Sequence, residues 1–151
     1  MFDLETITAI VTGTIGTVGF AILFNSEIRR LPFAALGGFI SCVLYFFFIS
    51  LTKSEFAANF IAAFVATTYF EICAKRLKAP VVVFLIPGLI PLVPGRALYY
   101  TMSGAIAKNF DEFSKNGLTT LLVAGGIAGG IIFSSLIFYV KKNYIEFRKT
   151  K

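Results

Sequence analysis

The sequence contains no histidine, and this absence excludes much of the chemistry that enzymes and metal sites use. Histidine is the side chain that changes charge near neutral pH, and it is also the commonest metal ligand. The two cysteines, Cys42 and Cys73, are too few for a disulfide framework. The sequence also has no Walker motif, no GxSxG motif and no cluster of metal-ligating residues. We therefore expect no enzymatic activity, no bound metal and no cofactor.

Charged residues are also scarce. They make up 15% of the 151 residues, against about 25% in soluble proteins, whereas hydrophobic residues make up 57%. A soluble domain of this length leaves about a third of its surface in water, so it could not bury so much apolar surface. Apolar side chains that face lipid remove this difficulty. The composition predicts an integral membrane protein in contact with the lipid bilayer, formed by a single transmembrane domain over residues 1–151.

The positive charge follows the pattern of membrane loops. The net charge is +6, yet the basic residues form short clusters between apolar segments, and no Lys or Arg precedes Arg29. We therefore expect no nucleic-acid partner. Asp3 and Glu5 stand where a cleavable signal peptide would carry positive charge, so the first apolar segment is predicted to remain as a span.

Five apolar segments are predicted to form transmembrane helices. A helix needs about 20 residues to cross about 30 Å of hydrocarbon. Ser54 precedes the third segment and is a candidate N-cap for its helix. The spans are expected at about 4–24, 33–51, 56–74, 81–107 and 118–140, followed by a basic tail at 141–151. The sequence therefore predicts an all-α membrane protein.

Prolines and glycines interrupt the fourth segment at residues 87–95. Each proline removes an amide donor and clashes with the preceding turn, so no regular helix is expected to run through this stretch. The interrupting residues are Pro87, Gly88, Pro91, Pro94 and Gly95. The segment either crosses the membrane once with a broken middle or returns as a re-entrant loop.

Charge bias favours the crossing arrangement. A single crossing places ten of the fourteen Lys and Arg residues on one side, whereas a re-entrant loop would leave nine of them outside and five inside. Because cytoplasmic loops carry the excess of basic residues, we expect the N-terminus outside and the tail at 141–151 in the cytoplasm.

The broken segment is also the best candidate for a binding site. Breaks in membrane helices leave backbone groups that lipid cannot satisfy, and transporters use them to bind ions and substrates. Arg96 lies within the apolar stretch at the start of the following half-helix, where it would attract an anion. The alternatives are a merely kinked helix, and an Arg96 that extends to the interface or pairs with Asp111 or Glu112.

Glu71 and Tyr99 are further candidates. Glu71 is the acidic residue within a predicted span, and it either contacts a proton or substrate or pairs locally with Lys75. Tyr99 offers a hydroxyl group or serves as an interfacial anchor. Asn59 is a weaker candidate of the same polar kind.

Two glycine patterns predict close helix packing, either within the chain or between subunits. They comprise Gly13, Gly16 and Gly19 in the first helix, and Gly125, Gly126, Gly129 and Gly130 in the last.

The sequence resembles the threonine/serine exporter family, over nearly the whole chain. The resemblance is carried by EICAKRLKAP at 71–80, FLIPGLIPLVPG at 84–95, Tyr99, and FAILFN at 20–25 followed by Arg29 and Arg30. Full-length members join a hydrolase-like soluble region and a first membrane half to a second membrane half, which this chain resembles. The Pro-Gly break, Glu71 and Tyr99 match the family pattern, whereas Arg96 rests on the physical argument alone.

The resemblance implies a multi-pass protein of the bacterial inner membrane that works with a larger subunit of the same family. It would export threonine and serine, or dicarboxylates such as succinate, driven by the proton gradient. A non-transporting scaffold subunit and a self-sufficient homo-oligomeric transporter remain as alternatives. Many transporters pair two similar halves around a midplane site, so a chain with one broken helix is expected to associate with a partner or with itself.

Overall fold

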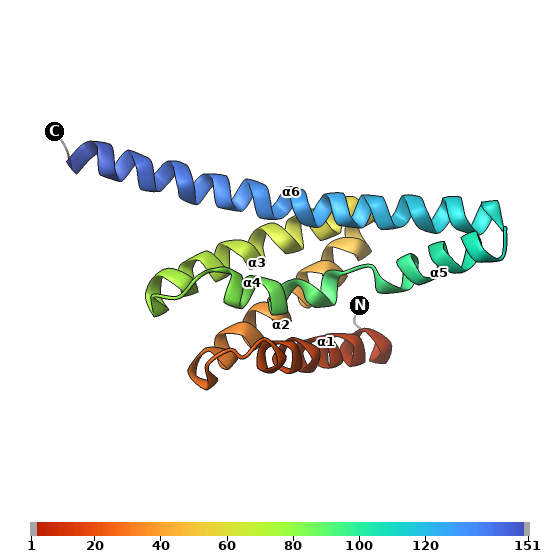
Figure 1. The fold of residues 1–151 in the computed structure, drawn as a ribbon, viewed down its shortest axis with the longest axis horizontal. Coiled ribbons are helices and arrows are strands. Elements are labelled where there is room, and N and C mark those ends of the chain that lie inside the picture. Colours follow the sequence, from red (N-terminus) through yellow and green to blue (C-terminus); the bar gives the residue numbers. More distant parts are fainter. Residues whose placement is uncertain (1–2, 150–151) are drawn as a thin grey trace.

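The computed structural model describes the backbone of residues 3–149 and the side chains of residues 3–141, and this part of the chain is helical with short turns (Figure 1). The elements are α1 (Leu4–Leu23), η1 (Ile28–Arg30), α2 (Leu31–Thr52), α3 (Glu55–Leu77), α4 (Val82–Leu89), η2 (Ile90–Leu92), α5 (Gly95–Ile106) and α6 (Phe110–Lys149). The all-α prediction is therefore confirmed.

The helices end where the sequence carries polar turn residues. Lys53 and Lys78 take left-handed backbone conformations, with φ of 50° and 49°, and stop α2 and α3. The Ser54 hydroxyl accepts a hydrogen bond from the Ala57 amide at 3.4 Å, so the predicted N-cap of α3 is confirmed.

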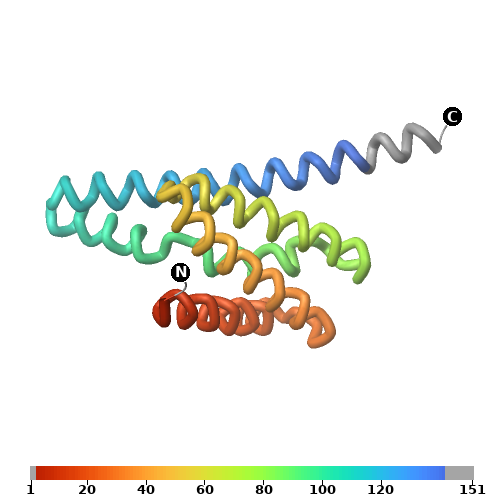
Figure 2. The backbone as a smooth tube through the Cα atoms, turned by 180° about the vertical axis from the view of Figure 1, so that it is seen from behind, coloured from red at the N-terminus to blue at the C-terminus, as the bar shows by residue number. Residues whose placement is uncertain are grey.

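Four helices are each long and apolar enough to cross a bilayer, and a bent pair makes a fifth if its two helices cross as one span. This pair, Val82–Leu92 and Gly95–Ile106, bends by 60° at residues 93–94. Figures 1 and 2 show that α4 begins at one end of the bundle and α5 finishes at the other, as a broken span would. The interruption of the fourth segment is confirmed, but it is shorter than the predicted 87–95, because α4 continues through Pro87 and Gly88 and the bend comes only after the η2 turn. The single crossing of the membrane stays a prediction. Which end faces the cytoplasm stays a prediction, and most side chains of the basic tail at 141–151 lie outside the described residues.

The last helix is longer than its apolar span. α6 begins at Phe110, so the polar residues 110–116 form its first turns rather than a loop. Asn109 stabilises this start because its side-chain oxygen accepts a hydrogen bond from the Glu112 amide at 3.3 Å. Polarity marks where the apolar span ends, but a helix can continue beyond the membrane.

Glycines bring α3 and α6 into close contact along much of their length. A Cβ atom at Gly126 would lie 2.7 Å from the Phe56 carbonyl oxygen, and one at Gly130 would lie 2.5 Å from that of Phe60. Cβ atoms almost never approach other atoms this closely, so only glycine fits at these positions. This glycine face, including Gly125 and Gly129, therefore packs within the chain.

The glycines of α1 behave differently. A Cβ atom at Gly13 would lie 2.9 Å from the Cys42 sulfur, whereas Gly16 and Gly19 have open space within 4 Å. Within the described residues, the second and third glycines of this helix therefore have no packing role.

Packing around Phe70 holds the first part of the broken span in place. The Phe70 ring is fully buried between Gly37 of α2 and Gly88 of α4, where any Cβ atom would overlap it. The single proton of the Ser41 hydroxyl is shared between the carbonyl oxygens of Gly38, at 2.8 Å, and Gly88, at 3.1 Å. Protein groups therefore satisfy a carbonyl next to the break, as a break within a membrane requires.

Candidate functional site

The main pocket lies beside the break in the fourth span and has a volume of about 580 Å³. Residues of α2, α3, η2, α5 and α6 line it, together with the linker at 93–94. The lining residues are Tyr45, Glu55, Asn59, Pro91, Leu92, Val93, Pro94, Arg96, Ala97, Tyr100, Glu112, Asn116, Thr119 and Val123. This volume suits a small polar solute.

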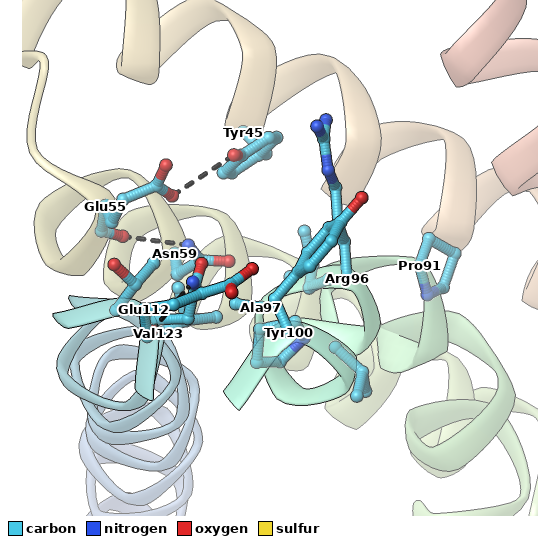
Figure 3. A pocket seen from close by; sticks show the side chains of 14 residues that line it. Tyr45, Glu55, Asn59, Pro91, Arg96, Ala97, Tyr100, Glu112 and Val123 are labelled. Carbon is cyan, nitrogen blue, oxygen red and sulfur yellow. Dashed lines mark hydrogen bonds between the residues drawn. The ribbon is translucent and has the colours of Figure 1, made fainter. Parts of the chain in front are cut away.

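A single cation lines the pocket. Arg96 lies in the first turn of α5, which restarts after the break, and its guanidinium carbon is 5.8 Å from the centroid of the Tyr100 ring. Figure 3 shows the two side chains extending next to each other from α5. Among the side chains of residues 3–141, no carboxylate lies within ion-pair distance of Arg96. The alternative in which Arg96 pairs with Asp111 or Glu112 is therefore absent there. Arg96 is exposed, so its guanidinium is accessible to an anion.

Two carboxylates and two amides line the opposite side. Glu55 accepts a hydrogen bond from the Tyr45 hydroxyl at 3.2 Å, and Asn59 donates to the backbone carbonyl of Glu55 at 2.8 Å. Glu112 and Asn116 repeat this local arrangement on α6, where Asn116 donates to the Glu112 carbonyl at 2.9 Å. In Figure 3, Glu55, Asn59 and Glu112 face Arg96 and Tyr100 across the pocket.

Asn59 carries a buried acceptor that has no partner. Its residue is 1% exposed, and no hydrogen bond reaches its side-chain oxygen from the described residues. Leaving a buried polar atom unpaired costs about 1–3 kcal/mol. Since Asn59 lines the pocket, a donor on a ligand or a water would satisfy it.

The structure brings three of the eight residues predicted as substrate-binding or gating residues into this pocket: Pro91, Pro94 and Arg96. Gly88 packs against Phe70 instead, and Pro87 lines a separate cavity of about 240 Å³ near Arg30. Gly95 begins α5 without lining the pocket.

Glu71 and Tyr99 also lie outside the pocket. Tyr99 is 66% exposed, with its ring 5.4 Å from that of Tyr100. Glu71 makes no ion pair with Lys75 in the described part of the chain, because the Lys75 amine lies over the Phe138 ring at 4.1 Å.

The acidic side of the pocket was not predicted as a binding surface from the sequence, although Asn59 was a weak candidate and Glu112 a possible partner of Arg96. Glu55 and Glu112 lie outside the apolar runs, so the sequence indicates turn residues at these positions. Asn116 and Thr119 lie at the edge of the last predicted span. One signal would have found most of them: the pattern Glu-Phe-x-x-Asn occurs at 55–59 and again at 112–116. Both copies stand near the start of their helices.

A second cavity of about 380 Å³ lies behind the main pocket, against α1. Tyr45, Pro91 and Leu92 line both cavities and so form a thin partition between them. The η2 turn of the break therefore lies between the two cavities.

The arrangement supports binding rather than covalent chemistry. A guanidinium recognises carboxylates, whereas carboxylate and amide oxygens accept hydrogen bonds from cationic groups. No group of three or more His, Cys, Asp or Glu residues that could hold a metal occurs in the described residues.

Comparisons with known proteins agree with the geometry. A family model described as "Threonine/Serine exporter, ThrE" matches residues 9–137. The chain is 24% identical to a "Threonine/serine exporter" from Corynebacterium glutamicum over 88% of its own length and 27% of that protein. It is 23% identical to an "Uncharacterized protein" from Haemophilus influenzae over 94% of its own length and 50% of that protein. The chain thus spans half or less of these relatives, and no solved structure matches it.

Proposed function

Since the chain belongs to the threonine/serine exporter family, we propose that it is a subunit of a secondary transporter for small amino or carboxylic acids. The family is one of exporters rather than enzymes, and the apolar helices identify a multi-pass membrane protein. The proposed location is the bacterial inner membrane. The proposed direction is export.

The observation that carries this proposal is the free Arg96 guanidinium at the break of the fourth span. Arg96 interrupts an apolar stretch of the sequence, and a charge within an apolar span is costly and usually functional. All the proposed substrates, threonine, serine and succinate, carry a carboxylate that this guanidinium can bind through paired hydrogen bonds. The Pro91 turn forms one wall of the same pocket, so movement of the break would open or close the site.

A larger subunit of the same family is the proposed partner. The chain covers 50% and 27% of the two relatives, which are therefore much longer than it is. The main pocket is lined by one interrupted segment, where many transporters use two. Gly16 and Gly19 leave open space on α1, and a partner helix that packs there would complete the path.

The alternative function, a non-transporting scaffold subunit, was based partly on the glycine face of the last helix. Gly126 and Gly130 pack against α3 within the chain, so they are not free to bind another subunit. Leu substitutions at Gly16 and Gly19 test whether α1 holds the larger subunit. They should abolish co-purification of the larger subunit if α1 holds it, whereas a self-sufficient homo-oligomer would transport without that subunit.

Reconstitution in proteoliposomes tests the proposal. The purified chain, alone or with the larger subunit, is assayed for efflux of labelled threonine, serine and succinate under a proton gradient. We expect efflux with both chains present, and its loss with Pro91→Leu at unchanged protein amount. Efflux from the chain alone would support a homo-oligomer. Absence of efflux in both preparations would overturn the transport function and favour the scaffold.

A further inference from the structure

We propose that the two Glu-Phe-x-x-Asn segments form a subsite for an ammonium group, which selects amino acids over carboxylic acids that lack one. This inference rests on the proposed function and deepens it, since Arg96 alone would accept either class. The segments are residues 55–59 of α3 and 112–116 of α6.

Each segment presents its amide oxygen in a fixed direction. The Asn59 nitrogen donates to the Glu55 carbonyl at 2.8 Å, and the Asn116 nitrogen donates to the Glu112 carbonyl at 2.9 Å. A backbone carbonyl can only accept, so the nitrogen of each amide must face it. The oxygen of each amide therefore points away from its own helix backbone, and both residues line the main pocket.

The Asn59 oxygen requires a donor. It is an acceptor on a residue with 1% exposure, and it has no partner among the described residues. A carboxylate of a ligand cannot satisfy it, because carboxylates only accept. An ammonium group carries three donors and is small enough to contact an amide and a carboxylate at once.

The carboxylates supply the matching charge. Glu55 uses one oxygen to accept from Tyr45 at 3.2 Å, and Glu112 uses one oxygen to accept from the Asn109 amide at 3.4 Å. Both hydrogen bonds hold a carboxylate at the pocket wall and leave its second oxygen without a partner among the described side chains. These are the groups that an ammonium ion binds through charge-assisted hydrogen bonds.

The charges across the pocket fit a zwitterion. Two carboxylates face one guanidinium, and Figure 3 shows Glu55 and Glu112 on the side opposite Arg96. An amino acid would place its carboxylate toward Arg96 and its ammonium toward the acidic side. A dicarboxylate would bring a second negative charge to Glu55 and Glu112, which repels it.

Threonine and 3-hydroxybutyrate form a suitable ligand pair, because 3-hydroxybutyrate is threonine without its amino group. Binding of each is measured to the full chain in lipid nanodiscs, with and without the larger subunit, in sodium-containing and sodium-free buffer. We expect threonine to bind at least about tenfold more tightly, since removing the ammonium leaves buried acceptors unpaired. Asn59→Leu, which keeps the side-chain shape, should reduce this preference by about tenfold.

Thr67→Val is the matched control. Thr67 is a fully buried residue of the same helix whose hydroxyl also lacks a partner, but it does not line the main pocket. The ligand preference should be unchanged in this variant. If Asn59→Leu fails to fold, Glu55→Gln removes the charge of the same subsite and should reduce the preference in the same direction.

Each outcome separates this inference from the proposed function. The subsite is overturned if threonine binds no more tightly than 3-hydroxybutyrate, or if the preference for threonine persists in both Asn59→Leu and Glu55→Gln. Either result leaves the proposed transport function unaffected. Sodium-dependent binding of both ligands with equal affinity would assign the acidic side to a metal cation and also overturn it. No saturable binding of either ligand in any preparation would contradict the proposed function itself.

Discussion

The contact between α3 and α6 makes a sharp prediction about two glycines on one helix. A Cβ atom at Gly130 would lie 2.5 Å from the Phe60 carbonyl oxygen and 2.8 Å from the Phe64 amide nitrogen. Both are backbone atoms that cannot rotate away. A Cβ atom at Gly125 would have its nearest neighbour, a ring carbon of Phe56, at 3.8 Å, which is an ordinary contact.

The two alanine variants should therefore differ in stability. Replacing a glycine within a helix by alanine gains about 0.5–1 kcal/mol, and this gain is common to both positions. Overpacking costs about 1–3 kcal/mol, and only Gly130→Ala incurs it. We expect Gly125→Ala to be neutral or stabilising, and Gly130→Ala to lie about 1–3 kcal/mol below it in free energy of unfolding.

The native cysteines provide the assay. Cys42 and Cys73 are free and only 4% and 6% exposed, so a fluorogenic maleimide should label them when the protein unfolds on heating. In a chain of about 150 residues, 1 kcal/mol shifts Tm by roughly 2–4 °C. Gly130→Ala should melt clearly below Gly125→Ala in the same detergent. Equal melting temperatures would refute the packing of α6 on α3 through this glycine face.

Three further changes test other parts of the structure. Phe70→Ala should destabilise the chain by about 3–5 kcal/mol in the same melting assay, because it removes a fully buried ring beside the break; a loss below 1 kcal/mol would contradict that placement. Ser134→Ala should cost about 1 kcal/mol, since its hydroxyl hydrogen-bonds to Thr68 at 2.9 Å between α6 and α3, and an unchanged Tm would argue against the bond. Glu71→Gln should leave the affinity for labelled threonine unchanged because Glu71 does not line the main pocket, and a tenfold weaker affinity would return it to the site.

The fold was largely predictable from the sequence because lipid imposes a simple rule. A span needs a long apolar run, so the helical segments and an interruption of the fourth follow from the residues alone. The position of the interruption did not, because α4 accommodates Pro87 and Gly88 and the bend comes after Leu92. The start of α3 was also predictable from its turn residues, because Ser54 forms the expected N-cap. The start of α6 at Phe110 was not predicted, since hydropathy cannot distinguish a helix that extends beyond the membrane from a polar loop.

The site was only partly predictable, for a physical reason. Arg96 and Pro91 were found because charge and proline within an apolar run are costly there. Glu55 and Glu112 lie at the ends of apolar runs, where acidic residues are common, and only the tertiary structure brings them to the same pocket. Gly88 shows the opposite case: its place in the motif suggested binding, but its role in the structure is to admit the Phe70 ring.

The central claim is that Arg96 in the main pocket binds the carboxylate of the transported solute. It is tested most directly by saturable binding of labelled threonine to the wild-type chain and to Arg96→Gln in lipid nanodiscs, alone and with the larger subunit. Arg76→Gln is the control, because Arg76 is exposed at the end of α3 and does not line the pocket. Loss of a charge-assisted hydrogen bond costs about 1.5–3 kcal/mol, so Arg96→Gln should weaken binding by about tenfold or more. Arg76→Gln should bind as the wild type does. Equal affinity of the wild type and Arg96→Gln would contradict the claim.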